Sequence, residues 1–257
     1  MSQPLRRTKI LATLGPATDA PGVIDALLAA GLNAVRLNFS HGTASDHAQR
    51  IAAVRAIASR TGKEIGVLAD LPGPKIRIEK FAEGKVMLKA GQPFALVCRA
   101  DAPPGDATQV GCSYLGLPRD VAAGDTLLLD DGLISLRVER VVGDIVHTEV
   151  ITDGALSNRK GLNRLGGGLN LGALTDEDRE HIATAAKLGV DFIAVSFCRS
   201  AADIELARSL ARAAGSDAQI VAKIERAEAI ENLVEIVEAA EVIMVARGDL
   251  GVEIGYA

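Results

Sequence analysis

Short apolar runs alternate with longer amphipathic stretches at the start of the chain, and this alternation predicts strands that take turns with helices. A short apolar run bounded by Gly, Pro or Asn is typical of a strand, whereas apolar residues spaced three and four apart indicate a helix. Thr43 and Asp46 stand at capping-box spacing before the longest amphipathic stretch, which supports a helix start there. The predicted strands are Lys9–Leu14, Ala34–Asn38 and Gly66–Asp70, and the predicted helices are Val23–Ala30 and Ser45–Arg60.

The pattern changes between Pro74 and Gly168, where apolar and polar residues alternate with a period of two and turn residues recur. We interpret this stretch as a small β-domain inserted into the surrounding fold. Gly166-Gly167-Gly168 ends it; a hinge is favoured over a phosphate-binding loop, because no strand–loop–helix order surrounds these glycines. The predicted strands are Lys85–Leu88, Pro93–Val97, Thr126–Leu129, Leu133–Val142 and Ile145–Ile151, with turns at Asp131-Gly132 and Gly143-Asp144.

Strands and helices alternate again after residue 168. The strands are near-continuous apolar runs, as in a parallel sheet that helices cover on both faces. The predicted fold is therefore α/β of the (β/α)₈ TIM-barrel type, with about six of eight strands and a small β-barrel lid inserted after the third strand. We expect barrel residues at 1–73 and 169–257, the lid at 74–168, and the remaining strands and a C-terminal domain to be absent from this chain. The predicted helices are Asp176–Leu188, Ala202–Ala214 and Ala227–Ala239, and the predicted strands are Phe192–Ser196, Gln219–Lys223 and Val242–Val245.

Composition narrows the range of partners. A net charge of −5 disfavours a general nucleic-acid binder, which needs a basic surface. No apolar run approaches the ~20 residues of a membrane span. Cys98, Cys112 and Cys198 lack the spacing of a CxxC pair, which fits reduced thiols better than disulfides or a zinc site. We therefore expect a soluble cytoplasmic protein that binds neither nucleic acid nor membranes.

Charged residues follow the last two apolar strands. Lys223 and Glu225 are two residues apart at the end of one strand, so their side chains leave on the same face, and Gly248-Asp249 follows the next strand. Two carboxylates suit Mg²⁺, and a lysine beside them suits a phosphate-bearing anion. In a (β/α)₈ barrel the active site lies at this edge. The alternatives are structural: acids at helix starts, a lysine that extends out of the core, and an exposed strand-end arginine at Arg36.

Seven short motifs, in this order and spacing, resemble those of pyruvate kinases along nearly the whole chain. The first three belong to the opening strand, the second strand and the entry to the lid, and the next two lie within the lid and at its return. The motifs are Thr8-Lys9-Ile10 with Leu14-Gly15-Pro16-Ala17, Val35-Arg36-Leu37-Asn38-Phe39-Ser40-His41-Gly42, Gly73-Pro74-Lys75-Ile76-Arg77, Asp130-Asp131-Gly132-Leu133-Ile134, Lys160-Gly161-Leu162-Asn163, Val221-Ala222-Lys223-Ile224-Glu225 and Val245-Ala246-Arg247-Gly248-Asp249-Leu250-Gly251.

The resemblance implies transfer of the phosphoryl group of phosphoenolpyruvate to ADP, giving pyruvate and ATP. Arg36 would grip the substrate phosphate and Lys223 would neutralise charge on the phosphoryl group in flight. Glu225 and Asp249 would hold Mg²⁺ or Mn²⁺. Backbone N–H groups of Gly248 and Asp249 would receive the substrate carboxylate. The family's threonine near the reacting carbon is expected beyond residue 257.

The resemblance also implies further contacts and partners. Positions that match the family's nucleotide contacts are Asn38, Ser40, His41, Arg77 and Lys160. The monovalent-cation site of many members matches Asn38, Ser40, Asp70 and the backbone of Leu71. Lys75 stands where those members carry a glutamate, which resembles the K⁺-independent bacterial branch, with the lysine ammonium in place of K⁺. The full-length protein would be a homotetramer.

Two other functions stay open at this point. One is a Mg²⁺-dependent barrel aldolase or lyase acting on a keto acid, in which the same two carboxylates stabilise an enolate. The other is an inactive fragment or a non-catalytic binding module, because an open barrel exposes apolar strand edges. We accordingly expect residues 1–257 by themselves not to form ATP.

Overall fold

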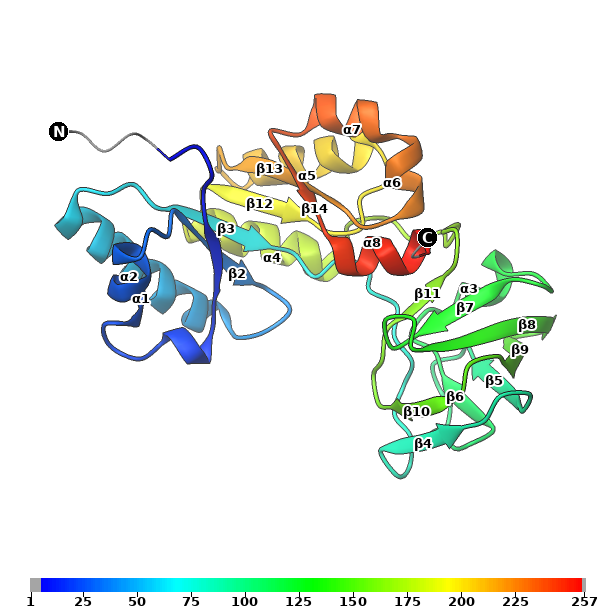
Figure 1. Cartoon of the computed structure of the whole chain (residues 1–257). Coiled ribbons are helices and arrows are strands. Elements are labelled where there is room, and N and C mark those ends of the chain that lie inside the picture. The colour runs from blue at the N-terminus through cyan, green and yellow to red at the C-terminus, as the bar shows by residue number, and fades with distance from the viewer. Residues whose placement is uncertain (1–5, 256–257) are drawn as a thin grey trace. The chain divides into compact units, whose positions relative to one another are not determined.

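A computed structural model describes residues 6–255, which divide into two compact units (Figure 1). The first unit comprises the described residues up to Gly73 together with Ala173–Lys223 and Val234–Met244. The second comprises Pro74–Gly172, Ile224–Leu233 and the described residues from Val245 onward. No helix among residues 6–255 is both long and apolar enough to cross a membrane. The division into domains at residues 73 and 168 stays a prediction.

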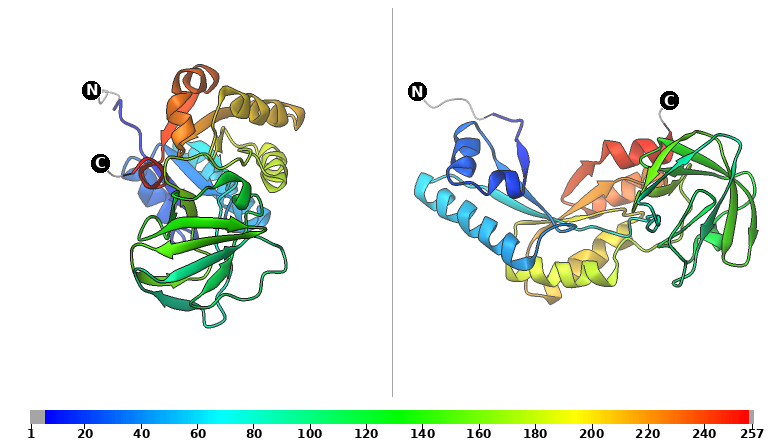
Figure 2. Two further views of the ribbon diagram at one scale, coloured as in Figure 1. Left: turned by 90° about the vertical axis from the view of Figure 1, so that its right-hand side faces the viewer. Right: turned by 90° about the horizontal axis from the view of Figure 1, so that it is seen from below.

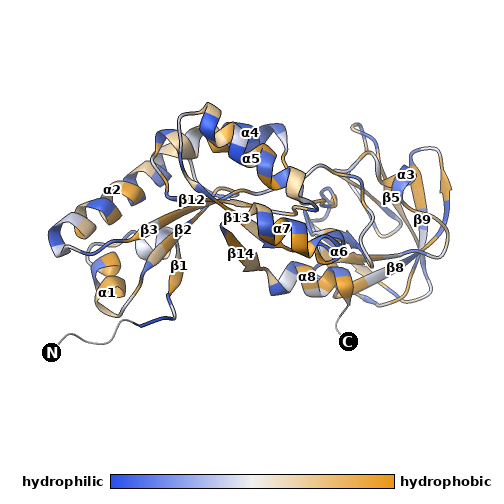
Figure 3. Ribbon diagram, turned by 90° about the horizontal axis from the view of Figure 1, so that it is seen from above, coloured by the Kyte–Doolittle hydropathy of each residue, from blue (hydrophilic) through white to orange (hydrophobic). Residues whose placement is uncertain are grey.

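A six-stranded sheet organises the first unit, in the order β1-β2-β3-β12-β13-β14. The pairs β1–β2, β2–β3, β3–β12 and β12–β13 are parallel. Figure 3 shows its strands mostly in the colour of hydrophobic residues. The α/β barrel-type fold predicted from the alternation is confirmed, with six strands in the predicted order. The strands are β1 (Leu11–Leu14), β2 (Ala34–Asn38), β3 (Gly66–Asp70), β12 (Phe192–Val195), β13 (Gln219–Ile224) and β14 (Val242–Val245).

Helices between these strands bury one stripe each. α2 buries Ile51, Val54 and Ile57, at the spacing from which it was predicted. Leu68, Ala194 and Val221, from three neighbouring strands, pack together as one layer of the core. The helices are α1 (Val23–Ala29), α2 (Ala44–Thr61), α4 (Asp176–Lys187), α5 (Ala201–Ala213) and α7 (Leu233–Ala239), with a short 3₁₀ turn at Pro16–Thr18.

Capping boxes begin α2 and α4. Thr175 Oγ1 accepts a hydrogen bond from Asp178 N–H at 3.0 Å, and Asp178 Oδ2 accepts one from Thr175 N–H at 2.9 Å. The other oxygen of Asp178, Oδ1, accepts the N–H of Gly73 at 3.1 Å. Gly73 has a φ of 67°, and a Cβ there would lie 2.8 Å from the side chains of Ser196 and Phe197, so only glycine fits. One buried carboxylate thus caps α4 and holds the end of the β3 segment.

Antiparallel strands make up most of the second unit, and the left view of Figure 2 shows them curling around a common interior. That interior is a single cluster of buried residues, mainly Leu, Ile, Val and Phe. One sheet has the order β11-β7-β8-β9-β5-β6 and the other pairs β10 with β4. The elements are β4 (Lys85–Leu88), β5 (Pro93–Val97), β6 (Gln109–Gly111), α3 (Leu117–Asp120), β7 (Thr126–Leu129), β8 (Ile134–Val142), β9 (Ile145–Val150), β10 (Gly154–Ser157) and β11 (Leu162–Arg164).

Several details differ from the prediction. The first strand begins at Leu11 rather than Lys9, and β6, α3, β10 and β11 were not predicted. The single helix predicted over Ala227–Ala239 is wrong, because Asn232, with φ −101° and ψ 20°, ends α6 (Ala227–Glu231) before α7 begins. The apolar spacing continues across Asn232, so the sequence pattern does not indicate that the helix is interrupted there. The last described helix is α8 (Arg247–Ile254).

Candidate active site

Asp70, at the end of β3, is a buried carboxylate that binds two cations in the first unit. Arg36 places Nε 2.6 Å and Nη2 2.5 Å from Asp70 Oδ2. Lys223 places Nζ 3.2 Å from Asp70 Oδ1. Only 2% of the Asp70 side chain is exposed, compared with 11% for Lys223 and 29% for Arg36. The three residues predicted at the strand ends of this unit therefore form one ion cluster.

Strand register explains why these side chains meet. Asn38 of β2 and Ala194 of β12 are both paired with Asp70 of β3. Residues two apart share a face, so Arg36 lies on the same face as Asp70 at the diagonal position. Ala194 is also paired with Val221 of β13, which places Lys223 on that face as well. Parallel pairing alone thus brings three residues from distant parts of the chain to one edge.

Two hydroxyl groups and a carbonyl complete this cluster. Lys223 Nζ donates to Ser196 Oγ at 2.6 Å, and Ser196 Oγ donates to the carbonyl of Leu71 at 2.7 Å. Arg36 Nη1 donates to Thr13 Oγ1 at 2.9 Å. Sequence reasoning assigned no role to Thr13 or Ser196. The sequence nevertheless places Ser196 at the end of the predicted strand Phe192–Ser196, among the polar residues at the edge where the other candidates lie.

The charge of the cluster favours an anion. One carboxylate faces a guanidinium and an ammonium, so the three groups carry a net charge of +1. Arg36 has five N–H donors, and the contacts to Asp70 and Thr13 occupy three of them. A partly exposed guanidinium with two further donors is suited to the oxygens of a phosphate or carboxylate.

The other predicted residues of the first unit lie in the turn after β2 and the segment after β3. Asn38 Oδ1 accepts the N–H of Ser40 at 3.0 Å, and its carbonyl accepts the N–H of His41 at 3.2 Å. Ser40 and His41 are exposed. Leu71 is buried, and its N–H donates to the carbonyl of Ala194 at 3.0 Å. Asn38 thus uses its side chain to close the turn that presents Ser40 and His41.

The second unit pairs two further candidates that are 174 residues apart in the chain. Lys75 Nζ lies 3.0 Å from Asp249 Oδ1, with 30% and 27% of the two side chains exposed. Gly248 and Asp249 belong to the first turn of α8, where backbone N–H groups have no acceptor within the helix. Lys75 therefore does not simply extend into solvent; it neutralises a candidate metal ligand.

Glu225 and Asp249 follow chain segments that are paired through their backbones. The N–H of Ala246 donates to the carbonyl of Ile224 at 3.2 Å, and Glu225 is the next residue after Ile224. Glu225 is only 2% exposed. No group of three or more His, Cys, Asp or Glu residues that could hold a metal exists within residues 6–255. A pair of carboxylates fits Mg²⁺, which is commonly held by one or two carboxylates together with water and substrate oxygens.

The two lid residues predicted to contact nucleotide are neighbours in the second unit. Arg77 forms a bridge with Gly161, and the carbonyl of Lys160 accepts the N–H of Ile78 at 2.9 Å. Arg77 Nη1 donates to the carbonyl of Arg159 at 2.9 Å, and Lys160 Nζ lies 2.8 Å from Asp130 Oδ1. Arg77 and Lys160 are thus two cationic residues on adjacent segments of the second unit.

The triple glycine is held in place by acidic residues of the same unit. Gly166, Gly167 and Gly168 all have positive φ, between 74° and 86°. Gly166 N–H donates to the carbonyl of Glu253, and Gly168 N–H donates to Glu228 Oε1, each at 2.8 Å. Burial raises the pKa of the Glu253 carboxyl despite a hydrogen bond from Asn163. For Glu228, burial is outweighed by the Gly168 N–H and by Arg226, so its pKa is lowered.

Comparison with known proteins identifies the family. Residues 5–257 match the family model described as "Pyruvate kinase, barrel domain". The chain belongs to the pyruvate kinase family. It is 54% identical over 260 residues to "Pyruvate kinase" of Haemophilus influenzae, and 54% identical over 258 residues to "Pyruvate kinase II" of Salmonella typhimurium. It is 43% identical over 249 residues to "Pyruvate kinase" of Mycobacterium tuberculosis.

These alignments cover nearly all of the chain but only part of each relative. The matches to the first two cover 99% of this chain and 54% of each relative, and the third covers 97% of the chain and 52% of that relative. The chain therefore spans about half the length of the pyruvate kinases it matches. The resemblance found in the sequence motifs is confirmed at the level of the family.

Proposed function

We propose that this chain carries the substrate-binding half of a pyruvate kinase, which transfers the phosphoryl group of phosphoenolpyruvate to ADP and gives pyruvate and ATP. The observation that carries the proposal is the cluster in which Asp70 holds Arg36 and Lys223 at one edge of the parallel sheet. Family membership supports the reaction, and the charge of the cluster supports an anionic substrate.

Arg36 and Lys223 act on the transferring phosphoryl group. Arg36 binds phosphate oxygens with the two N–H groups that Asp70 and Thr13 leave over, which fixes the direction of the phosphorus–oxygen bond. Lys223, positioned by Asp70 and Ser196, stabilises the charge that develops on the phosphoryl oxygens. Because phosphoryl transfer depends on positioning and electrostatics, a prealigned pair of cations supplies a large part of the catalysis.

Glu225 and Asp249 would hold the divalent metal, Mg²⁺ or Mn²⁺. When bound there, a divalent metal would supply positive charge that stabilises an enolate and phosphoryl oxygens. The N–H groups of Gly248 and Asp249 in the first turn of α8 bind the substrate carboxylate. Lys75, with Nζ 3.0 Å from Asp249 Oδ1, balances the charge of this carboxylate.

Asn38, Ser40, His41, Arg77 and Lys160 contact the nucleotide. Arg77 and Lys160 supply positive charge from adjacent segments, which suits the diphosphate of ADP.

Lys75 makes K⁺ unnecessary. Its ammonium, paired with Asp249, supplies a fixed positive charge in place of the K⁺ that members with a glutamate at this position bind through residues matching Asn38, Ser40, Asp70 and Leu71. The homotetramer expected for the full-length protein stays a prediction.

The test is a steady-state assay of pyruvate formation from phosphoenolpyruvate and ADP. The assay uses the product of the complete reading frame that contains these residues. We expect Arg36→Met, Lys223→Met and Asp249→Ala each to lower kcat about 100-fold or more, the size of effect typical of lost transition-state electrostatics. Arg60→Met, which removes a largely exposed partner of Asp25, is the matched control and should leave kcat unchanged. Activity within tenfold of the unmodified protein in the folded Lys223→Met or Asp249→Ala variant would contradict the proposal.

A further inference from the structure

Two thiols lie side by side in the inserted β-unit. Cys98 directly follows β5 and Cys112 directly follows β6, and the two strands are paired in parallel with Val97 opposite Gly111. The next pair in this register is Cys98 opposite Cys112, and the N–H of Cys112 donates to the carbonyl of Val97 at 3.0 Å. Directly opposed residues share one face and have Cα atoms about 5 Å apart, which falls within the range that a disulfide spans.

Both thiols face the core of this unit, and they interact with each other. Cys98 and Cys112 are 4% and 2% exposed and belong to its cluster of buried residues. The Cys98 thiol donates a hydrogen bond to the carbonyl of Leu96 at 3.8 Å, and the interaction between the two neighbouring thiols raises the pKa of Cys98 and lowers that of Cys112. Burial and the charge of Glu79 oppose ionisation of Cys112, whereas the N–H of Tyr114 favours it. Cys112 is therefore the thiol that ionises first.

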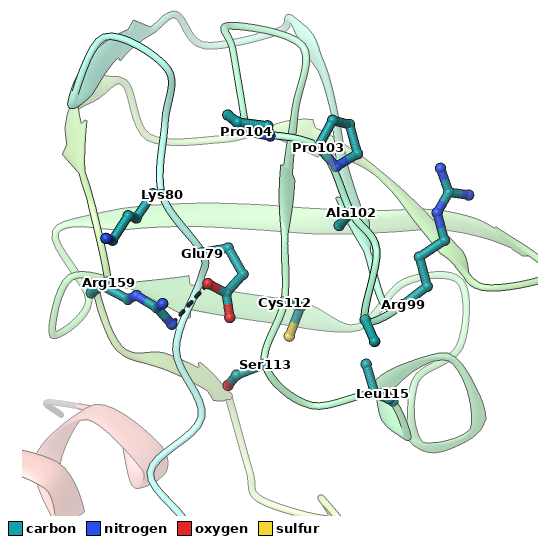
Figure 4. Close-up of a pocket in the computed structure, with 11 residues that line it drawn as sticks. Glu79, Lys80, Arg99, Ala102, Pro103, Pro104, Cys112, Ser113, Leu115 and Arg159 are labelled. Carbon is teal, nitrogen blue, oxygen red and sulfur yellow. Dashed lines mark ion pairs between the residues drawn. The ribbon is translucent and has the colours of Figure 1, made fainter.

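A cavity of about 470 Å³ opens onto Cys112 and not onto Cys98. Figure 4 shows the sulfur of Cys112 among the residues that line the cavity, which include three cationic residues, Lys80, Arg99 and Arg159. Arg159 Nη1 is paired with Glu79 Oε2 at 2.7 Å. A small polar reagent can thus reach the sulfur of Cys112, whereas Cys98 lies in the core of the unit and does not line the cavity.

We propose that Cys98 and Cys112 are a modification site at which a hydroperoxide forms a reversible intramolecular disulfide. The Cys112 thiolate attacks one peroxide oxygen, so an S–O bond forms and the O–O bond breaks. The leaving oxygen takes up a proton as water or an alcohol, and Cys112 is left as a sulfenic acid. The sulfur of Cys98 then attacks the sulfur of Cys112. The S–S bond forms, the S–O bond breaks, and the hydroxyl leaves as water with the proton of Cys98.

Electrons balance in this sequence, because the hydroperoxide takes the two electrons that the two thiols lose. The disulfide closes the loop between β5 and β6, which includes Arg99 and several other lining residues of the cavity. The inference concerns the inserted unit alone and does not depend on the proposed phosphoryl transfer.

The experiment counts thiols by intact mass. The folded 257-residue chain is treated with hydrogen peroxide, the peroxide is removed with catalase, and the protein is denatured and alkylated. Before treatment, all three cysteines of the chain should be alkylated. After treatment, only one should be, and dithiothreitol should restore the other two. A peptide map should then show Cys98 linked to Cys112.

Cys198 serves as the matched control. It is buried in the first unit, where its thiol donates to the carbonyl of Lys223 at 3.3 Å. Cys198→Ser should fall from two alkylated thiols to none, whereas Cys98→Ser should form no disulfide and leave Cys112 as a sulfenic acid that dimedone traps. Retention of all three thiols in the treated unmodified chain, or oxidation at Cys198 as fast as at Cys112, would overturn the proposal. Both results are read from the unmodified protein, so they stand even if a variant does not fold.

Discussion

The Asp70→Asn substitution tests whether the ion cluster is held together by charge. Asparagine keeps the shape of the side chain and removes its negative charge, so Arg36 and Lys223 lose a shared counter-ion and repel each other. Removing one partner of a buried ion pair costs about 3–5 kcal/mol. Because 29% of the Arg36 side chain is exposed and water screens part of its charge, we expect the lower end, about 3 kcal/mol of the free energy of unfolding.

The assay is urea unfolding followed by far-UV circular dichroism, a signal to which the helices of the first unit contribute most. Asp25→Asn is the matched control, because the same change is made there in a pair whose side chains are 64% and 44% exposed. That substitution should cost less than about 1 kcal/mol. Combining Asp70→Asn with Lys223→Met should be less destabilising than the sum of the single changes, by roughly 1–3 kcal/mol. If Asp70→Asn costs no more than Asp25→Asn, the electrostatic account of the cluster is wrong.

Three other predictions concern the buried histidine, a helix cap and the lid lysine. Burial, and to a smaller extent the positive charge of Arg50, lowers the pKa of His47 below its ordinary value of 6.5. As the pH falls, the unfolded chain therefore takes up a proton at His47 before the folded chain does. The free energy of unfolding should decrease as the pH drops below about 6.5. Urea midpoints between about pH 7 and pH 5 should decline less in His47→Gln. Thr175→Ala should lose about 1 kcal/mol in the same unfolding assay, and Thr175→Ser should retain most of it. Lys75→Glu, which puts a second carboxylate beside Asp249, should lower pyruvate formation and increase its response to K⁺; strong K⁺ activation of the unmodified protein would contradict this.

The main strands could be predicted because buried parallel strands require short, near-continuous apolar runs, and few other structural elements require them. β2, β3 and β14 have the bounds predicted from sequence. Elements of three or four residues such as β6 and β11 offer too few positions for a period to be visible. Local pattern also fails where one residue decides, as at Asn232, where α6 ends although the apolar spacing continues.

The strand-end location of the candidate site followed from the same pattern, but its pairing did not. Arg36, Asp70 and Lys223 each end or nearly end an apolar strand, and parallel strands bring such ends to one edge. That Asp70 binds both cations depends on register across three strands, which no local signal specifies. The contact between Lys75 and Asp249 joins residues 174 positions apart, and only the folded chain brings them together.

The hydrogen bond from Gly73 N–H to Asp178 joins residues on either side of the segment Pro74–Gly172, which belongs to the second unit. β3 and β12 are adjacent in the sheet. The bond joins the segment after β3 to the helix before β12, although about one hundred residues separate Gly73 from Asp178. Loop-closure entropy rises only with the logarithm of length, so lengthening a link from about ten residues to about one hundred costs roughly 2 kcal/mol. Because this bond joins the two ends of the segment, a change in the segment's length does not require a change in the pairing of β3 with β12. At this junction an ancestral barrel could have gained, exchanged or lost a whole β-unit while the register of β3 and β12 stayed the same.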